Sequence, residues 1–255
     1  MRRASRGRTG AFLRCPLASD PLSPEETRRY ARHLVLKGMG GRGQQALKAA
    51  RVLVVGAGGL GSPVIAYLAG AGVGTLGIAE HDEIALSNLQ RQVIHTSAGI
   101  GSGKAESARD FAAALNPHVA IRLHPQLTAA NADAELAGYD IVLDGTDNLV
   151  TRRAVAAAAA KAGIPLVSGA VSMFDGQVTV FAPGGPGFDA LYPIGADDAD
   201  LPSCEATGIL GPLTGVIGTL MAMEAIKLIT SIGTPLIGRV LTYDSQGAHF
   251  SEFAF

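Results

Sequence analysis

Residues 51–63 read RVLVVGAGGLGSP, and this stretch decides the fold. Its first part, RVLVVG, is a run of aliphatic residues bounded by glycine, which is typical of a buried parallel strand. Gly56, Gly58 and Gly61 then satisfy the pattern G-x-G-x-x-G between this strand and a following helix. Such a loop lets backbone amides approach a phosphate at the positive N-terminus of the helix. The stretch therefore predicts nucleotide binding on a Rossmann-like α/β fold, with a purely structural tight turn as the alternative.

Helical and strand patterns alternate along the rest of the chain, in the βαβα order that gives a mostly parallel sheet. Residues 176–183, GQVTVFAP, have the period-two pattern of a strand, and there we expect antiparallel strands to extend the sheet. Ser23, Pro24 and Glu26 form the N-cap and capping-box pattern that predicts an N-terminal helical arm. The expected helices cover 62–70, 104–115, 130–136, 153–162 and a long apolar stretch ending at 229, and the other expected strands cover 75–79, 120–123, 141–147, 165–171, 239–244 and 249–255.

The composition fits a globular enzyme, because 47% of the 255 residues are hydrophobic and the formal net charge is −1. Only 5% of the residues are aromatic and there is no basic excess, so nucleic acid is not an expected partner. The most apolar stretch, 209–229, is interrupted by glycines and contains Glu224 and Lys227. These residues favour a core helix over a membrane span.

The first twenty residues contain five arginines and no acid before Asp20. Since neither a hydrophobic stretch nor a cleavage pattern follows, we expect 1–20 to be a disordered basic extension rather than a transit peptide or an RNA-binding tail. Two cysteines, Cys15 and Cys204, cannot form a disulfide framework and indicate a reducing compartment. We therefore expect a cytoplasmic protein with one domain over 21–255.

Charged residues after the glycine loop indicate which ligand it holds. Glu80 ends a strand about twenty residues beyond the loop, where a dinucleotide fold places an acid on a ribose hydroxyl. The loop itself does not choose between NAD, FAD and ATP. Arg91, Lys104 and Asp147 supply two cations and one carboxylate, which suit a triphosphate with Mg²⁺. The alternative is that the two cations are solvated surface charges.

Several segments, in order and with matching spacing, resemble the MoeB/ThiF family of adenylyltransferases, which are relatives of ubiquitin-activating enzymes. The resemblance extends from about Tyr30 to Phe250. The segments are HLVLKGMGGRGQQALKAARVLVVGAGGLGSP (33–63), SNLQRQVIHT (87–96), GSGKAESARDFAAALNPHV (101–119), DIVLDGTDN (140–148), PLVSGAVSMFDGQVTVF (165–181) and SCEATGILGPLTGVIGTLMAMEAIK (203–227).

The resemblance implies an enzyme that uses ATP and Mg²⁺ to adenylate the C-terminal Gly-Gly carboxylate of a ubiquitin-like sulfur-carrier protein, with release of pyrophosphate. The pathway would be molybdopterin, thiamine or thiolated-tRNA biosynthesis, and a separate sulfurtransferase is a further possible partner. Three other hypotheses stay open: adenylation of a peptide or a modified tRNA, an NAD-dependent oxidoreductase, and a non-catalytic binding homologue.

The resemblance also assigns roles to residues. It places the glycine loop on the phosphates, Glu80 on the ribose, and Asp147 on Mg²⁺ beside Asn148, although the family usually has Asp where this chain has Glu80. Arg32 resembles an arginine that the family supplies to the neighbouring subunit's ATP site, which implies a homodimer. The implied catalytic residues are Arg32, Arg91, Lys104, Asp147 and Cys204, and the implied nucleotide-binding residues are Gly56, Gly58, Gly59, Gly61, Glu80, Ser87, Asn88, Leu89, Gln90, Arg91, Lys104, Asp147 and Asn148.

Two features concern sulfur and zinc. Cys204 stands at the family position of a loop cysteine that can form a covalent link to sulfur or an acyl group, with a thiol of no function as the alternative. Gly187 and Ala190 stand where many members have the first CxxC pair of a zinc site, so we expect no structural zinc and a less restrained loop. The resemblance divides the adenylation domain into an arm (23–50), a nucleotide-binding core (51–182), a mobile crossover loop (183–206) and a C-terminal helix and hairpin (207–255).

Overall fold

The computed structural model describes residues 18–193 and 208–255, which form an eight-stranded sheet in the order β3-β2-β1-β4-β5-β6-β7-β8. Strands β3, β2, β1, β4 and β5 are parallel to their neighbours, whereas β6, β7 and β8 are antiparallel. This confirms the predicted extension of a mostly parallel sheet by antiparallel strands. The strands are β1 (Arg51–Val55), β2 (Thr75–Ala79), β3 (Ala120–His124), β4 (Ile141–Asp144), β5 (Leu166–Ser172), β6 (Asp175–Phe181), β7 (Arg239–Asp244) and β8 (His249–Ala254).

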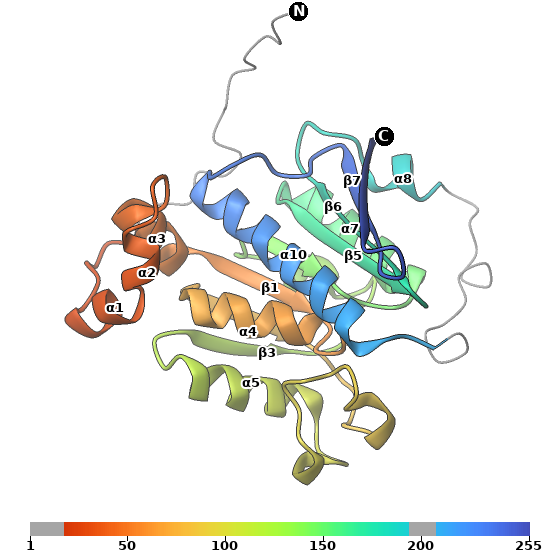
Figure 1. Cartoon of the computed structure of the whole chain (residues 1–255), viewed down its shortest axis with the longest axis horizontal. Coiled ribbons are helices and arrows are strands. Elements are labelled where there is room, and N and C mark those ends of the chain that lie inside the picture. The colour runs from red at the N-terminus through yellow and green to blue at the C-terminus, as the bar shows by residue number, and fades with distance from the viewer. Residues whose placement is uncertain (1–17, 194–207) are drawn as a thin grey trace, which may run out of the picture.

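Helices cover both faces of the sheet, as Figure 1 shows for α4, α5 and α10 on the near face and α7 on the far face. Alternate residues of β1 divide between the two cores: Val52 and Val54 pack on one side, and Leu53 and Val55 on the other. Three layers result. The helices are α1 (Pro24–Arg29), α2 (Ala31–Leu34), α3 (Gly40–Ala49), α4 (Gly61–Ala71), α5 (Lys104–Leu115), α6 (Ala132–Glu135), α7 (Leu149–Ala162), α8 (Phe188–Leu191) and α10 (Gly211–Thr230), with short 3₁₀ turns η1 (Leu86–Asn88) and η2 (Ser97–Gly99).

Three segments differ from the sequence-based expectations, the first being β4, which ends at Asp144 instead of continuing to residue 147. Helix α7 begins at Leu149 rather than at Arg153, because the side chain of Asn148 accepts a hydrogen bond from the backbone N–H of Thr151 and caps the helix. Residues 183–193, expected to start a mobile loop, include the one-turn helix α8, whose Phe188 packs on Phe181. The rest of the expected crossover loop and most of the basic extension lie outside the described residues.

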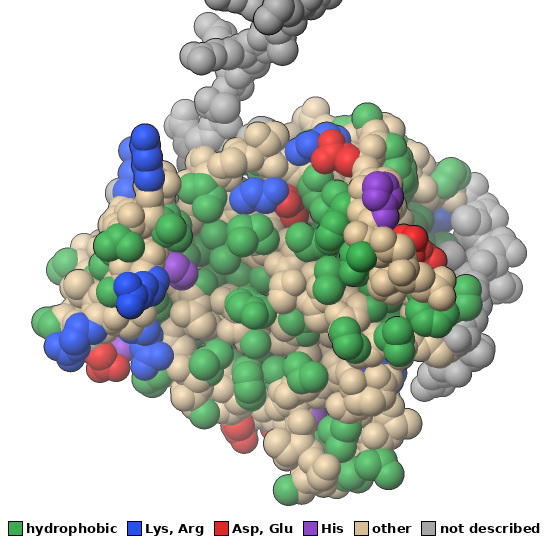
Figure 2. All heavy atoms as spheres, viewed as in Figure 1, with side chains coloured by type: hydrophobic (Ala, Val, Ile, Leu, Met, Phe, Trp, Pro, Cys, Tyr) green, Lys and Arg blue, Asp and Glu red, His purple; other side chains and the backbone are tan. Residues whose placement is uncertain are grey.

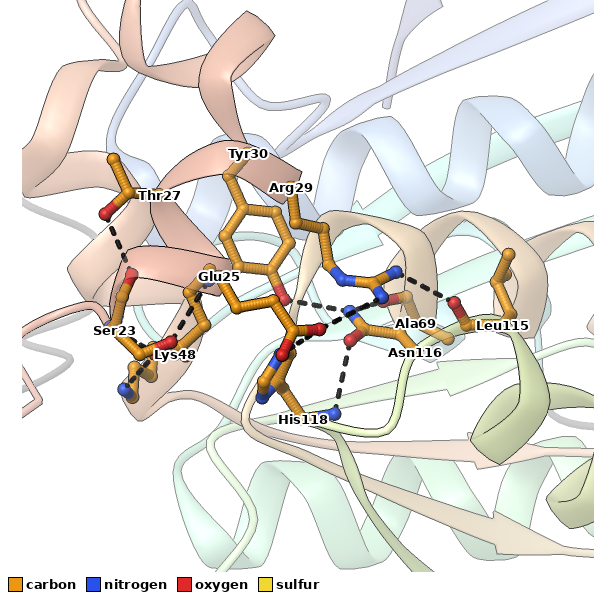
Figure 3. Close-up of polar contacts among 11 residues, drawn as sticks. Ser23, Glu25, Thr27, Arg29, Tyr30, Lys48, Ala69, Leu115, Asn116 and His118 are labelled. Atoms are coloured by element: carbon orange, nitrogen blue, oxygen red, sulfur yellow. Dashed lines mark hydrogen bonds and ion pairs between the residues drawn. The ribbon is translucent and has the colours of Figure 1, made fainter.

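The N-terminal arm, α1 to α3, is attached to the ends of α4 and α5 by polar contacts (Figure 3). The hydroxyl of Tyr30 accepts a hydrogen bond from the side-chain amide of Asn116 at 2.8 Å, and the same amide donates to the carbonyl of Ala69 at 2.7 Å. Gly72, with φ +79°, leaves the space for this hydroxyl, since a Cβ there would lie 2.3 Å from it. Arg29 donates to the carbonyl of Leu115 beside this contact. The capping box predicted at Ser23 is present.

Helix α10 is the core helix that the sequence predicted. By length and hydropathy alone it could cross a membrane, but 56% of its most apolar window is buried inside the domain. It packs against α4, β5 and β6, and Gly218 allows the close approach, because a Cβ there would lie 2.5 Å from the carbonyl of Leu60. The buried Glu224 forms an ion pair with Lys227 and accepts a hydrogen bond from the N–H of Leu236. The acid therefore fixes the chain that leads into β7.

Candidate functional site

A cavity of about 580 Å³ lies at the carboxyl ends of β1, β2 and β4. The chain runs from β1 outward to β2 and β3, then crosses back to β4 on the other side of β1. Ligands of open α/β sheets bind at such a switch point, in the crevice beyond the strand ends. The volume is in the range of small-molecule sites. Topology alone therefore makes this cavity the candidate site.

The glycine loop forms one wall of the cavity. Gly56 has φ +90°, which favours glycine, and Gly58 and Gly59 line the cavity. Gly61 does not line it; a Cβ at Gly61 would lie 1.9 Å from the carbonyl oxygen of Gly56. Close packing of α4 on the end of β1 thus explains Gly61, whereas Gly56, Gly58 and Gly59 face the cavity.

The tip of the loop is held from both sides at Ala57. Its N–H donates to Glu80 Oε2 at 2.9 Å, and its carbonyl accepts from His95 Nε2 at 3.0 Å. Because a carbonyl can only accept, the proton is on Nε2, and Nδ1 accepts from Ser107 at 2.9 Å. Burial lowers the pKa of His95, which keeps the ring neutral. The ring is a buried histidine with both nitrogens hydrogen-bonded.

Glu80, predicted from the sequence to bind a ribose, makes backbone contacts that the sequence did not indicate. Its second oxygen, Oε1, accepts from the backbone N–H groups of His81 and Asp82 at 2.7 and 3.0 Å. The carboxylate lines the cavity, with a side chain 6% exposed. It therefore braces the loop while one face stays toward the ligand space.

The two cations predicted from the sequence both reach the cavity. Lys104 begins α5, is 4% exposed, and pairs with Asp82 at 3.0 Å. Arg91 donates to the carbonyl of Ser87 and to the side chain of Asn88, at 3.2 Å each. Neither cation is simply solvated: a buried lysine and a braced guanidinium face the same space as the glycine loop. The arrangement suits an anionic ligand.

The acid at the end of β4 is available for a cation. Asp147 lines the cavity, is exposed, and has no hydrogen bond or ion pair with any described residue. Mg²⁺ is commonly held by one or two carboxylates together with substrate phosphates, so this carboxylate fits the ion. The one three-ligand cluster within the described part of the chain is Glu80, His81 and Asp82. Its carboxylates are already used by backbone amides and by Lys104, which makes it a poor metal site.

Several predicted site residues lie outside the cavity. Arg32 is on the arm, exposed, and has no partner among the described residues. Ser87 in η1, and Leu89 and Gln90 just after it, do not line the cavity; Gln90 reaches the carbonyl of Ile209 instead. Cys204 and Cys15 fall outside the described residues. The predicted residues that line the cavity are Gly56, Gly58, Gly59, Glu80, Asn88, Arg91, Lys104, Asp147 and Asn148.

Sequence reasoning missed many cavity residues, of which three carry charge or an unpaired buried polar atom close to the predicted site. Gln92 is 4% exposed, and its Oε1 is buried without a hydrogen-bond partner. Arg152, 6% exposed, donates to the carbonyls of Thr146 and Gly169 and joins the ends of β4 and β5. Asp82 pairs with Lys104. Asp82 could have been found from its position just after Glu80, but no local pattern marks a buried arginine on a helix.

The cavity continues from the nucleotide side onto the antiparallel strands. Gln177 on β6 donates to the Tyr192 hydroxyl at 2.6 Å, and burial raises the pKa of Tyr192, so the phenol stays neutral. This half of the cavity carries several polar side chains. It is lined by Ser172, Asp175, Gln177, Tyr192, Thr242 and Ser251, among others.

A glycine loop, an acid at the second strand and two cations share one cavity, and the sequence over residues 30–255 matches the ThiF family. The chain belongs to the ThiF family. Curated ThiF relatives include "Probable adenylyltransferase/sulfurtransferase MoeZ" of Mycobacterium tuberculosis, 50% identical over 88% of this chain and 59% of the relative. The "Sulfur carrier protein adenylyltransferase" of Thermus thermophilus is 46% identical, over 89% of this chain and 87% of the relative. The "Molybdopterin-synthase adenylyltransferase" of Escherichia coli is 44% identical, over 91% and 93%.

Solved structures share the fold of this ThiF-family chain. PaaA superposes with a TM-score of 0.79 at 22% identity, covering 92% of this chain and 75% of that one. Escherichia coli MccB, solved with ATP, gives a TM-score of 0.77 at 20% identity, with 89% and 71% covered. At these identities the likeness concerns the fold alone. The chain spans 59% of the length of the MoeZ relatives.

Proposed function

We propose that this ThiF-family protein is an adenylyltransferase that activates the C-terminal carboxylate of a small sulfur-carrier protein with ATP. One observation carries the proposal: a single cavity joins the glycine loop, Glu80, Arg91, Lys104 and Asp147 to an open polar surface on β5 to β7. The Thermus thermophilus and Escherichia coli relatives are named as adenylyltransferases, and the name of the former includes a sulfur carrier protein. No observation favours hydride transfer with NAD.

The proposed reaction begins when a carboxylate oxygen attacks the α-phosphorus of ATP. The bond from that phosphorus to the oxygen bridging to the β-phosphate breaks, and pyrophosphate leaves with the electron pair, so an acyl-adenylate remains. A carboxylate is already anionic and needs no general base. The protein therefore has to place it in line with the leaving group and to stabilise charge on the phosphate oxygens.

The residues of the cavity divide this task. Gly58 and Gly59 leave room for phosphates at the N-terminus of α4, and Lys104 and Arg91 lie where they can neutralise phosphate charge. Lys104 would exchange its pairing with Asp82 for a phosphate, or share it. Asp147 would hold Mg²⁺, which when bound neutralises further negative charge on the phosphates. Glu80 retains an acceptor face for a ribose hydroxyl.

The carboxylate substrate would enter on the side of the cavity formed by the antiparallel strands β6 and β7. The cavity extends from residues of β6 and β7 to the glycine loop, so a flexible chain terminus such as Gly-Gly could lie along it and reach the phosphate end. Polar groups there, such as Gln177 and Tyr192, could bond its backbone. A peptide or a modified tRNA remains as an alternative acceptor that the test below can reveal.

The test is ATP–pyrophosphate exchange with each small carrier protein of the same cell that ends in Gly-Gly. Exchange should require the carrier and should be lost when its last two residues are removed. Exchange with no dependence on any such carrier would contradict the proposal. Carrier-free exchange that depends on an added peptide or tRNA would identify the alternative acceptor.

We further propose that the enzyme is a homodimer in which Arg32 serves the neighbouring subunit's site. In its own subunit Arg32 does not line the cavity and has no partner among the described residues. Figure 2 shows hydrophobic side chains over α4 and α10, next to the Lys and Arg side chains of the arm. On these helices Tyr67 is 60% exposed and Met223 50% exposed, which suits a surface that a second copy would cover.

The remaining parts of the proposal follow from the sequence. We propose cytoplasmic localisation, a single adenylation domain over 21–255, and a separate sulfurtransferase partner. Cys204 would contribute to covalent or sulfur transfer rather than to adenylation, and metal analysis should find no structural zinc, since Gly187 and Ala190 replace a CxxC pair. Adenylation by Cys204→Ser at the normal rate, with impaired sulfur transfer, is the expected result for the cysteine.

A further inference from the structure

Three titratable side chains form a hydrogen-bonded cluster where β3 ends. His124 Nδ1 lies 2.6 Å from Glu135 Oε2, and its Nε2 lies 2.6 Å from the Tyr139 hydroxyl. Since the carboxylate can only accept, Nδ1 carries the proton and the phenol donates to Nε2 in the neutral ring. The imidazole is 15% exposed and Tyr139 5% exposed. None of the three residues lines the candidate site.

A glycine in strand β2 leaves the space that this cluster occupies. A Cβ at Gly77, in the middle of β2, would lie 2.3 Å from the Tyr139 hydroxyl, so only glycine admits the phenol there. The guanidinium of Arg51 lies over the opposite part of the same ring, 5.7 Å from its centre. Tyr139 is thus fixed by packing, and it fixes His124 in turn.

The strand order shows what lies beside this cluster. The glycine loop follows β1, Glu80 follows β2, and Gln126 and Leu127 follow β3, in the spatial order β1, β2, β3. A nucleotide with its phosphates on the loop and its ribose at Glu80 extends its base toward the end of β3. Gln126 and Leu127 line that end of the cavity. The N–H and carbonyl of Leu127 have no hydrogen bond to any described residue, which leaves them free for a base.

This segment is linked to the cluster through α6. The side-chain amide of Asn131, at the N-cap of α6, donates to the carbonyl of Gln126 at 2.9 Å and accepts from the N–H of Thr128 at 2.7 Å. Helix α6 has four residues and cannot hold its position by its own hydrogen bonds. Glu135 at its last turn is held by His124. Together with the core packing of Ala132 and Leu136, this contact fixes α6, and through Asn131 it helps to fix the position of Gln126 and Leu127.

We propose that His124, held between Glu135 and Tyr139, is a positioning residue that fixes the 125–128 segment as the wall for the nucleobase. It acts through α6 and Asn131 and does not touch the nucleotide. The inference rests on the proposed use of ATP. It predicts that loss of the cluster weakens the part of the affinity that comes from the base and leaves binding of the phosphates intact.

The experiment measures binding of ATP and of inorganic tripolyphosphate, both with Mg²⁺, to the full-length protein by calorimetry. His124→Leu should weaken ATP binding by about tenfold, the order of one lost charge-assisted hydrogen bond. Tyr139→Phe removes only the hydroxyl and should weaken it by about threefold, which keeps the test available if His124→Leu folds poorly. Tripolyphosphate, which has no base, should bind both variants as it binds the original protein.

A matched control lies on the same helix. Asp133 of α6 forms an exposed ion pair with Lys161 of α7 and does not contact His124. Asp133→Asn should leave both dissociation constants unchanged, because exposed pairs contribute little. Unchanged ATP binding in both cluster variants would overturn the inference, and so would an equal loss for ATP and tripolyphosphate, since that would mean a general structural effect.

The outcome for the inference is separable from that for the proposed function. An original protein that binds ATP, with variants that bind it equally well, refutes the positioning role alone. ATP binding that responds to the cluster, in a protein that adenylates no carrier, refutes the acceptor assignment alone. A protein without affinity for ATP refutes both.

Discussion

Replacing Asn116 by alanine is expected to destabilise the protein by about 3 kcal/mol. Asn116 is fully buried and takes part in three hydrogen bonds: to the Tyr30 hydroxyl, to the Ala69 carbonyl, and from the N–H of His118 at 3.2 Å. Each is a net contribution of about 1 kcal/mol, and alanine leaves all three partners without a replacement. Alanine also removes packing between the arm and α5. The estimate of about 3 kcal/mol counts only hydrogen bonds and is therefore a lower bound on the loss of stability.

Urea denaturation followed by far-UV circular dichroism measures the loss in the free energy of unfolding. In a thermal scan, a loss of about 3 kcal/mol corresponds, for a chain of this size, to a fall of roughly 6–12 °C in Tm. Tyr30→Phe is the graded comparison: it removes one hydrogen bond and keeps the ring, so about 1 kcal/mol should be lost. A loss below about 1 kcal/mol for Asn116→Ala would refute the view that these contacts hold the arm in place.

Four other predictions concern the site. Asp147→Ala should reduce ATP–pyrophosphate exchange by about a hundredfold or more, whereas near-normal exchange would remove Asp147 from the magnesium site. Gly61→Ala should cost about 1–3 kcal/mol of stability in urea titrations, because its Cβ would collide with the carbonyl of Gly56. Mixed Arg32→Ala and Asp147→Ala subunits should regain exchange activity that neither has alone; no recovery would argue against shared sites. Burial depresses the pKa of His95, so as the pH falls the unfolded chain takes up a proton before the folded one, and stability falls below about pH 6.5. The His95→Gln variant should therefore lose less stability than the original protein between about pH 8 and about pH 5.5. An equal loss in the two proteins would contradict this.

Much of the fold could be predicted because local and global signals agree. The strand before Gly56 is aliphatic on both faces, as a central parallel strand must be, and β2 and α5 have the bounds read from the sequence. The start of α7 could not be placed, since Asn148 reads equally well as a loop residue and as an N-cap. The one-turn helix α8 depends on aromatic packing with Phe181, a contact that local sequence does not encode.

The candidate site could likewise be predicted only in part. Residues within a contiguous pattern, such as Asp147 after β4, could be assigned to the cavity because strand ends meet at one edge of the sheet. Gln92 and Arg152 were missed because their position depends on tertiary burial rather than on spacing. The contact of Glu80 with the glycine loop could not be predicted either, since only the folded chain brings its carboxylate to the N–H of Ala57.

The clamp on Ala57 has a thermodynamic consequence. With Glu80 on its N–H and a neutral His95 on its carbonyl, both backbone groups of Ala57 at the tip of the glycine loop are held by the protein itself. A nucleotide bound as proposed would lose less free energy to the ordering of that backbone, so more of the interaction could be expressed in the transition state. The entropy of the loop was lost once, when the chain folded, and need not be lost again in each catalytic cycle.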